Sequence, residues 1–155
     1  MTGQTICFAV TLLFMNDISS TQKNVLCDNS DYLVEESVAK GIDPYVFTAL
    51  IFHESTFRPY AVSKAGACGL TQVVPRWSKY TCAQLKNPRI SIKEGTSHLQ
   101  RWLRRAKGDV VLALCGYNAG NRCFTNRKFK SRIAKKYSNK ILETARKLRA
   151  EGEPE

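Results

Sequence analysis

The chain has 155 residues and is 43% hydrophobic, which is enough to bury one core and too short for two independent domains. The same hydrophobic fraction excludes an intrinsically disordered chain. The formal net charge is +11 at pH 7, which favours a polyanionic partner such as nucleic acid, anionic lipid or a bacterial wall polymer. The alternative is a solvated basic face without a specific partner.

The first predicted element is a hydrophobic run, ICFAVTLLFM, at residues 6–15. The run is too short to span a bilayer, which takes about 20 residues, but it fits the apolar part of an export signal. No Lys or Arg precedes the run, and Ser19 and Ser20 form a poor cleavage site. We expect residues 1–20 to be a signal peptide or a hydrophobic N-terminal segment. The alternatives are that this segment is buried in the fold or serves as an uncleaved anchor.

The rest of the chain reads as one helical domain over residues 21–150, with a flexible tail at 151–155. A helix in DYLVEESVAKG should end at Gly41, because glycine is common just after a helix end. Asp43 should cap the following helix, PYVFTALIFHES, which should start at Pro44 and stop before the next proline.

Loops dominate residues 60–90, where a small pair of strands is the one β element that we expect. SIKE at 91–94 has the form of a capping box and predicts the start of a helix that Gly108 ends. Asp109 should cap a short apolar helix, VVLALCGY, which should be buried. The last predicted helix covers residues 127–149, and its apolar stripe consists of Phe129, Ile133, Tyr137, Ile141, Ala145 and Leu148.

Six cysteines are spread along the chain without a CxxC pair, which argues against a zinc or redox motif. A Cys68–Cys82 disulfide is the pairing that we favour, because it would close the loop-rich segment and stabilise the fold by about 3 kcal/mol. Cleavage of the first twenty residues would remove Cys7 and leave an odd number of thiols. The alternative is that several of the cysteines are simply buried, apolar thiols.

One acidic residue lies on the apolar side of its predicted helix. Glu54 follows Ile51 by three residues and Leu50 by four, which places the three side chains on one face. Burial disfavours an ionised carboxylate, and the negative end of the helix adds to that effect. We therefore expect an acid that keeps its proton near neutral pH and can act as a general acid. The alternative is an edge position with an ion pair to Arg58.

Two polar clusters accompany this glutamate. Gly66 and Gly69 permit a positive φ and close approach of a ligand to the backbone of the loop that follows the helix. Hydroxyl and amide groups in such places suit a sugar or its N-acetyl group. The side chains concerned are Ser63, Thr71 and Gln72 in the loop and Tyr117 and Asn118 at the end of the buried apolar helix. The alternative for Tyr117 is packing, with its hydroxyl group satisfied inside the fold.

The stretches HESTFRPYAVSKAGACGLTQVVP and ALCGYNAG together resemble the lytic transglycosylase catalytic domain, the SLT or goose-lysozyme-like family. The family pattern is E-S-x-F-x-P-x-A-x-S-x-x-G-A-x-G-L-x-Q-x-x-P, followed later by A-x-x-x-Y-N-A-G. All fixed positions match, and the resemblance covers roughly residues 28–148. Thr71 and Val74 stand where members often carry methionine, so contacts to the glycan are expected to differ. Cys68 lies inside the loop, which is less usual and would tie the loop geometry to redox state if this cysteine is bonded.

The resemblance implies a mainly helical, lysozyme-like domain that cleaves peptidoglycan without a metal or another cofactor. Carried over by position, Glu54 would be the sole catalytic acid/base. The groups around the scissile sugars would be Ser63, Gln72, Tyr117 and Asn118. The implied reaction breaks the β-1,4 bond between N-acetylmuramic acid and N-acetylglucosamine and forms a 1,6-anhydro sugar, so the enzyme would be a lyase.

Three other functions are weighed against this one. They are a muramidase that hydrolyses the same bond, a wall-binding or virion-structural protein that kept the fold, and a nucleic-acid binder. The last rests on the basic final helix alone and lacks a recognised binding motif. We expect that helix to attract anionic wall polymers and no specific nucleic acid. We also expect export to the periplasm, the cell wall or the extracellular space of a bacterium, or service in a phage virion or in lysis.

Overall fold

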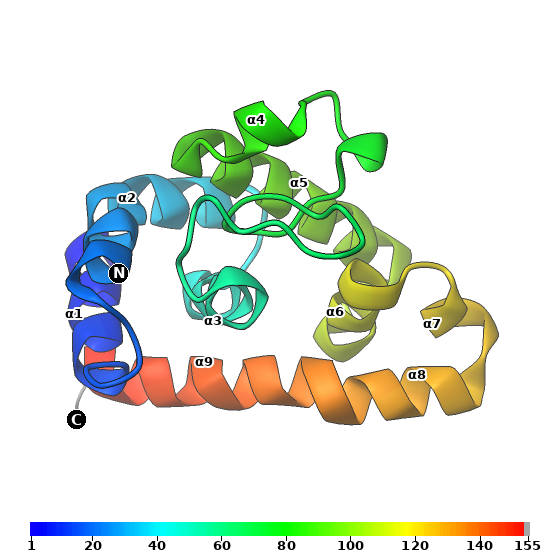
Figure 1. Cartoon of the computed structure of the whole chain (residues 1–155). Coiled ribbons are helices and arrows are strands. Elements are labelled where there is room, and N and C mark those ends of the chain that lie inside the picture. The colour runs from blue at the N-terminus through cyan, green and yellow to red at the C-terminus, as the bar shows by residue number, and fades with distance from the viewer. Residues whose placement is uncertain (154–155) are drawn as a thin grey trace.

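The computed structural model describes residues 1–153. Helices surround one main core, and no strand forms in these residues (Figure 1). In chain order the elements are α1 Gly3–Leu13, α2 Ser20–Ala39, α3 Pro44–Ser55, the 3-10 turn η1 Pro75–Trp77, α4 Cys82–Leu85, α5 Pro88–Arg105, α6 Val110–Ala119, α7 Arg122–Thr125, α8 Arg127–Ile133, the π-helical segment η2 Ala134–Ser138 and α9 Asn139–Gly152. The predicted helical fold is confirmed. The expected β element is reduced to isolated bridges from Cys68 to Val62 and Val73.

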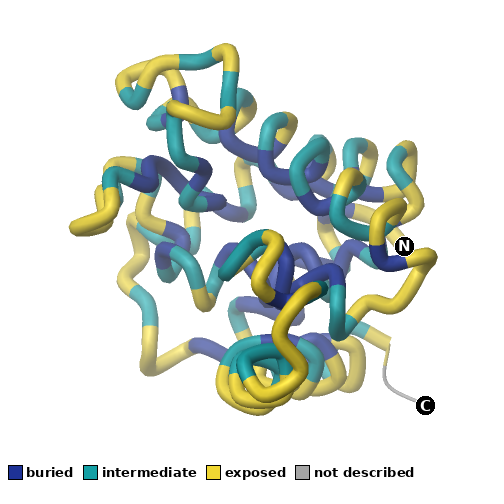
Figure 2. Tube along the Cα trace, turned by 90° about the vertical axis from the view of Figure 1, so that its right-hand side faces the viewer, coloured by how far each residue is buried: buried dark blue, intermediate teal, exposed yellow. Residues whose placement is uncertain are grey.

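Helix α3 lies at the centre of the fold, where it packs against α9, α2 and α1 (Figure 1). Its predicted start is confirmed: the Asp43 side chain accepts a hydrogen bond from the N–H of Tyr45, and Pro44 occupies the first turn. Phe47 and Leu50 have no exposed surface, and burial of such side chains contributes about 1.5–3 kcal/mol each. Figure 2 shows that the buried parts of the chain face this interior, while exposed parts lie outside.

The hydrophobic N-terminal run forms α1, which packs against α2 and α9. Ile6, Ala9 and Val10 have no exposed surface, and a disulfide joins Cys7 in α1 to Cys27 in α2. One face of the run is therefore part of the core, whereas Phe8, Leu12 and Met15 are exposed. Export of the chain stays a prediction. We refer to α1 and this disulfide as the N-terminal clamp. No helix within residues 1–153 is both long enough and apolar enough to cross a membrane.

Two expected helix starts are wrong. Helix α2 already begins at Ser20, where Ser19 and Gln22 form a capping box. Helix α5 begins at Pro88 with Asn87 as its cap, so residues 91–94 lie inside the helix and form no capping box. The helix starts at Asn87–Pro88 and not at residues 91–94, because proline lacks the N–H that would have no partner in the first turn. At the other end of the chain, α9 continues through residue 152 into the expected tail, and residues 154–155 lie outside the described part.

The expected last helix is confirmed as an unbroken run of α8, η2 and α9. Its apolar stripe repeats every four residues from Phe129 to Ala145, and such a stripe would drift by about 40° per step around a regular α-helix. The π-helical segment, which has more residues per turn, takes up part of this drift. Tyr137 lies in that segment and reaches α3.

All six cysteines are paired in disulfides: Cys7–Cys27, Cys68–Cys82 and Cys115–Cys123. The predicted Cys68–Cys82 pair is therefore confirmed, and the alternative of buried free thiols is wrong. Such a set of disulfides is typical of proteins that fold in an oxidising compartment.

Candidate active site

Glu54 lies in the last turn of α3, on the face that points into the fold. Thr56 ends the helix in the left-handed conformation, with φ of 52°, and turns the chain into the following loop. The hydroxyl of Tyr137 donates a hydrogen bond to Oε1 of Glu54. The alternative pairing with Arg58 is wrong, because Nε of Arg58 donates to the carbonyl of Ser55 at 3.0 Å. Within residues 1–153, no ion pair includes Glu54.

The surroundings of Glu54 favour its protonated form. Burial raises the pKa of Glu54 from 4.5 to about 7, and the hydrogen bond from Tyr137 opposes this rise because it stabilises the carboxylate. Near neutral pH the carboxyl group therefore exists in both forms, as general acid/base work requires. Burial, the charge of Glu54 and their hydrogen bond raise the pKa of Tyr137 well above 10, so this phenol stays a neutral donor.

A second phenol, Tyr117, lies beside the carboxyl group. Its hydroxyl donates to the carbonyl of Thr71 at 2.7 Å, which ties the end of α6 to the loop. Burial raises the pKa of Tyr117, and the negative charge of Glu54 raises it further, so this phenol is neutral as well. The hydroxyl is thus satisfied inside the fold, as one interpretation of the sequence expected. Asn118, the next residue, is exposed.

Gln72 and Ser63 shape the loop of residues 61–72, which we call the 61–72 loop. Gln72 has a positive φ of 52°, and its Nε2 donates to the carbonyls of Ala61 at 3.0 Å and Gly69 at 2.9 Å. The hydroxyl of exposed Ser63 accepts a hydrogen bond from the N–H of Ala67 at 3.0 Å. Both side chains therefore hold the backbone of their own loop in one shape.

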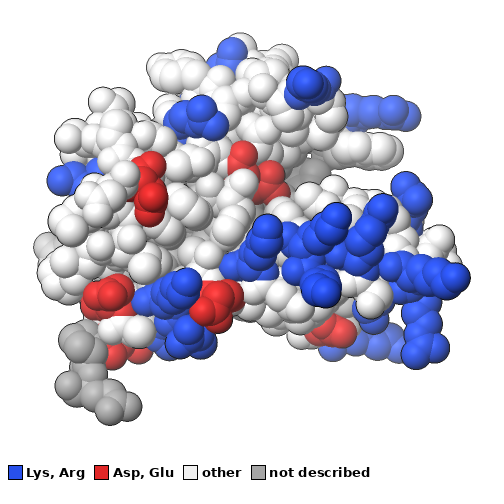
Figure 3. Space-filling view, turned by 60° about the horizontal axis from the view of Figure 1, so that its bottom comes forward, with Lys and Arg blue, Asp and Glu red and all other residues white. Residues whose placement is uncertain are grey.

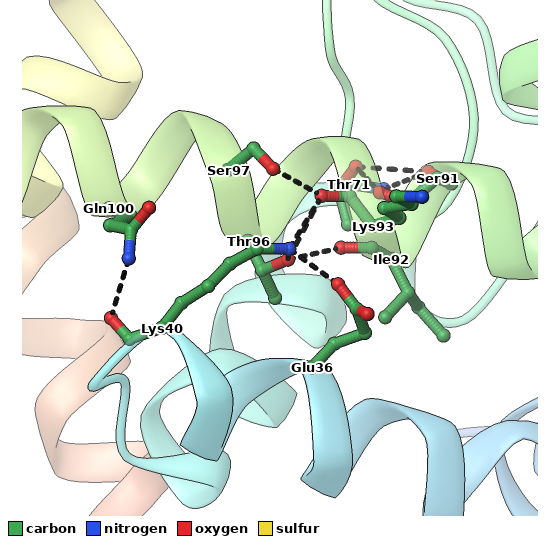
Figure 4. Close-up of polar contacts among 9 residues, drawn as sticks. All are labelled: Glu36, Lys40, Thr71, Ser91, Ile92, Lys93, Thr96, Ser97 and Gln100. Atoms are coloured by element: carbon green, nitrogen blue, oxygen red, sulfur yellow. Dashed lines mark hydrogen bonds and ion pairs between the residues drawn. The ribbon is translucent and has the colours of Figure 1, made fainter.

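Thr71 joins the 61–72 loop to α5. Its N–H donates to Oγ of Ser91 at 3.1 Å and its hydroxyl donates to the carbonyl of Ser91 at 2.9 Å, and all these groups are buried (Figure 4). A Cβ atom on Gly95 would lie 2.6 Å from the Thr71 side chain, so the two segments meet where only glycine fits. Lys40 in turn ties α2 to α5, because its ammonium donates to Thr96 at 2.7 Å (Figure 4). The carbonyl that holds Tyr117 is therefore fixed on a rigid scaffold.

Sequence reasoning missed two groups of this site. Tyr137 was assigned to an apolar stripe. The strict four-residue spacing of that stripe could have indicated a π-helical segment, and such segments often occur at functional sites. Glu94 was assigned to a capping box. Its charge also raises the pKa of Tyr117, so a second carboxyl group lies near the site. Oε1 of Glu94 lies 3.6 Å from Nε2 of His98, and both side chains are largely buried.

Fold and site together define a class of protein: a helical domain in which a buried carboxyl group, able to give and take a proton, lies near two phenols. Residues 31–141, more than half of the chain, match the Transglycosylase SLT domain family, and the chain belongs to this family. The resemblance inferred from the two sequence motifs is thereby confirmed. The match includes Glu54, Tyr117 and Tyr137, whereas α1 and the first part of α2 precede it.

The curated relatives are much longer proteins. The chain is 30% identical over 115 residues to membrane-bound lytic murein transglycosylase C of Actinobacillus succinogenes. This alignment covers 66% of the chain and 30% of that relative. It is also 37% identical over 73 residues to endo-type membrane-bound lytic murein transglycosylase A of Klebsiella pneumoniae. That alignment covers 39% of the chain and 36% of the relative. The chain thus spans about a third of the length of these proteins.

Solved structures share the fold. The 70 kDa soluble lytic transglycosylase of Escherichia coli superposes with a TM-score of 0.66 at 20% identity, over 84% of this chain and 27% of that one. An inactive mutant of the lytic transglycosylase Slt of Pseudomonas aeruginosa superposes with a TM-score of 0.64 at 24% identity, over 76% of this chain and 23% of that one. At these identities the likeness concerns the fold.

Proposed function

We propose that this domain cleaves peptidoglycan as a lytic transglycosylase. It would break the β-1,4 bond between N-acetylmuramic acid and N-acetylglucosamine and release a 1,6-anhydro end. The observation that carries the proposal is the position of Glu54: it lies in the last turn of the central helix α3 and accepts a hydrogen bond from Tyr137, and burial raises its pKa to about 7. Membership of the SLT family supports peptidoglycan as the substrate.

The proposed mechanism uses Glu54 twice. Its protonated form donates to the glycosidic oxygen, and the N-acetyl group of the muramic sugar stabilises the positive anomeric carbon. The resulting carboxylate then takes the proton of the sugar's own 6-hydroxyl, which attacks the anomeric carbon and closes the anhydro ring. Water takes no part in this route, so one acid/base suffices, whereas most glycosidases need two carboxylates.

The neighbours of Glu54 have distinct proposed roles. Tyr137 holds the carboxyl group and stabilises its ionised form after the first proton transfer, as its hydrogen bond to Oε1 supports. The Tyr117 hydroxyl donates its proton to Thr71 and would accept the N–H of the N-acetyl group through its remaining lone pair. Gln72 keeps the loop in a shape that admits the glycan. Ser63 and Asn118 are exposed and would contact the sugars on either side.

Hydrolysis of the same bond is the second candidate, and Glu94 is the observation that favours it. A second carboxylate near the site could activate a water molecule. Burial lowers the pKa of His98, so near neutral pH its contact with Glu94 is not an ion pair and leaves the Glu94 carboxylate available for this role.

Product analysis on purified sacculi tests both candidates. Mass spectrometry of the wild-type digest should show anhydro ends, and Glu54→Gln should lower the rate at least about a hundredfold. The matched control is Glu143→Gln, which changes an exposed acid of α9 and should leave the rate unchanged. Reducing ends that disappear in Glu94→Gln would establish hydrolysis instead. Full activity of Glu54→Gln would refute both mechanisms.

A basic surface supports attraction to anionic wall polymers. Lys and Arg side chains gather along α8 and the following part of the last helix (Figure 3). We propose that this face increases the local concentration of the enzyme at the wall. The residues to neutralise are Lys128, Lys130, Arg132, Lys135 and Lys136. Compared with the wild type, the variant with all five side chains neutralised should bind sacculi less tightly at low salt and equally well at high salt. Unchanged binding at low salt would leave this face without a partner.

We also propose that the chain acts outside the cytoplasm. Three disulfides are consistent with an oxidising compartment, and the relatives are described as membrane-bound murein enzymes. Fractionation of the source cell would test this localisation: recovery with the cytoplasmic fraction would contradict it.

A further inference from the structure

A pocket of about 360 Å³ opens where the end of α3 meets η2 and α9, and we call it the α3–α9 pocket. Its size falls in the range of small-ligand sites. His53 forms the α3 side of the pocket, one position before Glu54. Lys135 belongs to η2, two positions before Tyr137. The proposed reaction uses neither His53 nor Lys135, so the pocket has no role in it.

A hydrogen bond joins the two helices at this pocket. Nε2 of His53 and the hydroxyl of Thr144 lie 2.8 Å apart, which connects the last turn of α3 to α9. Burial lowers the pKa of His53, and the charge of Lys140 lowers it further, so the imidazole is neutral near neutral pH. His53 therefore contributes a hydrogen bond and no charge. Because this part of the pocket is formed in advance, a ligand has less to order when it binds.

The lining of the pocket is cationic. Three of its seven residues are lysines, Lys135, Lys140 and Lys147, and one, Glu143, is acidic. Both carboxylate oxygens of Glu143 accept hydrogen bonds from Arg146, at 2.8 and 3.1 Å, so a cation outside the lining neutralises this acid. Lys147 lies 3.9 Å from the same carboxylate, whereas no ion pair within residues 1–153 includes Lys135 or Lys140. The pocket therefore favours an anion.

The donors of the pocket suit a phosphate group. Three ammonium groups and the amide of Asn139 can donate to several oxygens at once, and a phosphate offers more acceptor oxygens than a carboxylate does. None of the seven lining residues is aliphatic, so the pocket offers no apolar surface to lipid chains. Apart from His53 it has no aromatic ring on which a nucleic-acid base could stack. The lining thus favours a hydrophilic chain that carries phosphates.

We propose that the α3–α9 pocket binds a phosphate group of a hydrophilic phosphodiester polymer. This proposal goes beyond the cleavage reaction and does not depend on it. It also differs from the attraction that we assign to the basic face of α8, because it names one site, and Lys135 is the residue that both have in common. A bound phosphate would lie against the last turn of α3, beside the residue that precedes Glu54. The pocket would therefore retain the protein on polymers that carry phosphodiesters.

Nuclear magnetic resonance with the full-length chain tests the site. The probes are a glycerol phosphate oligomer joined by phosphodiesters, inorganic phosphate, acetate and phosphatidylglycerol vesicles. The oligomer should shift the amide signals of His53, Asn139 and Thr144, and acetate should bind at least about tenfold more weakly. The charge of the bound phosphate should also raise the pKa of His53 by about 1. His98, the other histidine of the chain, lies outside the pocket and should keep its pKa.

Exposed residues of the pocket can be changed without touching the core. Lys140→Gln combined with Lys147→Gln should weaken oligomer binding at least about tenfold, because charge-assisted hydrogen bonds are lost. The matched control is Lys93→Gln combined with Lys107→Gln, which removes two exposed charges outside the pocket and should change the affinity less than about twofold. Asn139→Asp adds a carboxylate to the pocket at nearly constant shape and should also weaken binding at least about tenfold.

Several outcomes would overturn the proposal. Equal oligomer binding by the pocket variant and its control would show that the attraction is diffuse. Acetate binding as tight as that of the oligomer would remove the preference for phosphate. Binding of inorganic phosphate or of vesicles without binding of the oligomer would exclude the polymer as the ligand.

Cleavage of glycan strands is measured separately, so the two proposals can fail independently. Oligomer binding that depends on Lys140 and Lys147, in a protein that cleaves no strands, would support the pocket and refute the reaction. Strand cleavage by a protein that does not bind the oligomer would overturn the pocket and leave the reaction standing.

Discussion

The N-terminal clamp and the 61–72 loop are each fixed by one disulfide, but they bury different kinds of groups. The disulfides join residues 20 and 14 positions apart, Cys7–Cys27 and Cys68–Cys82. The clamp precedes the part of the chain that matches the family, and its fully buried side chains are those of Ile6, Ala9 and Val10. The loop lies inside the match and buries the polar side chain of Thr71 together with the apolar side chains of Cys68 and Leu70.

The difference shows that stability and chemistry reside in separate segments. The clamp buries apolar surface, which favours folding. The site requires unfavourable arrangements: a carboxyl group with a raised pKa at Glu54 and positive φ angles at Thr56, Phe57 and Gln72. Each such backbone conformation costs on the order of 1–3 kcal/mol. The clamp and the disulfides offset these costs.

The largest expected effect comes from removing one disulfide at a time. The double variants Cys7→Ser with Cys27→Ser and Cys68→Ser with Cys82→Ser should each lose about 3 kcal/mol of unfolding free energy. Only the second should also lose kcat, by about tenfold, because the loop positions the partner of Tyr117. Thermal unfolding and turnover on sacculi measure the two quantities. An equal loss of kcat in a folded clamp variant would break the distinction between the two regions.

The next effect concerns the unfavourable carboxyl group. The pKa of Glu54 is about 7 in the folded chain against 4.5 unfolded, so between these values the folded state binds more protons and stability falls as pH rises. Glu54→Gln should therefore unfold like the wild type below about pH 4.5 and be more stable by roughly 3 kcal/mol above about pH 7. The difference between the two proteins isolates this group from the histidines. A constant difference across the pH range would contradict the raised pKa.

A smaller effect is expected from the phenol that opposes the raised pKa. The hydrogen bond from Tyr137 lowers the pKa of Glu54, so Tyr137→Phe should move the alkaline limb of the pH–rate profile to higher pH. The rate should also fall several-fold, because the ionised intermediate loses a donor. Tyr45→Phe serves as the control, since its hydroxyl bonds Glu153 far from the site. An unmoved limb would show that Tyr137 does not act on the carboxyl group.

The smallest effect compares two threonines. Thr71→Val removes a buried hydroxyl that bonds the Ser91 carbonyl and should cost about 1 kcal/mol while lowering kcat. Thr11→Val makes the same change in the clamp, where the hydroxyl bonds the carbonyl of Cys7 within one helix. It should cost less and leave kcat unchanged. Equal kcat values for both variants would mean that the link from loop to α5 has no part in turnover.

Local sequence signals predicted much of this fold correctly. The Asp43–Pro44 start of α3, the apolar face that carries Glu54 and the Cys68–Cys82 disulfide all follow from residues close together in the chain. Competing signals were the first source of error. Asn87 with Pro88 and the later S-x-x-E pattern both predict a helix start, and propensity alone does not choose between them.

Contacts between distant residues were the second source of error. The bond from Tyr137 to Glu54 joins residues 83 positions apart, and no spacing rule relates them. The hydrophobic run of α1 was equally ambiguous, because an export signal and a buried helix share the same composition. Of the polar residues predicted from the two motifs, Tyr117 lies beside Glu54, whereas Ser63 and Gln72 bond their own loop, which only the backbone geometry reveals.

The π-helical segment restricts how the length of the last helix can vary. Tyr137 lies within this segment, whereas Ile141 and Leu148, beyond it, are buried in the core. Inserting or deleting one residue between Tyr137 and Ile141 would rotate one half of the helix by about 100° relative to the other. The phenol and the buried side chains could then no longer both keep their partners. Length changes should therefore be rejected at this point in the helix.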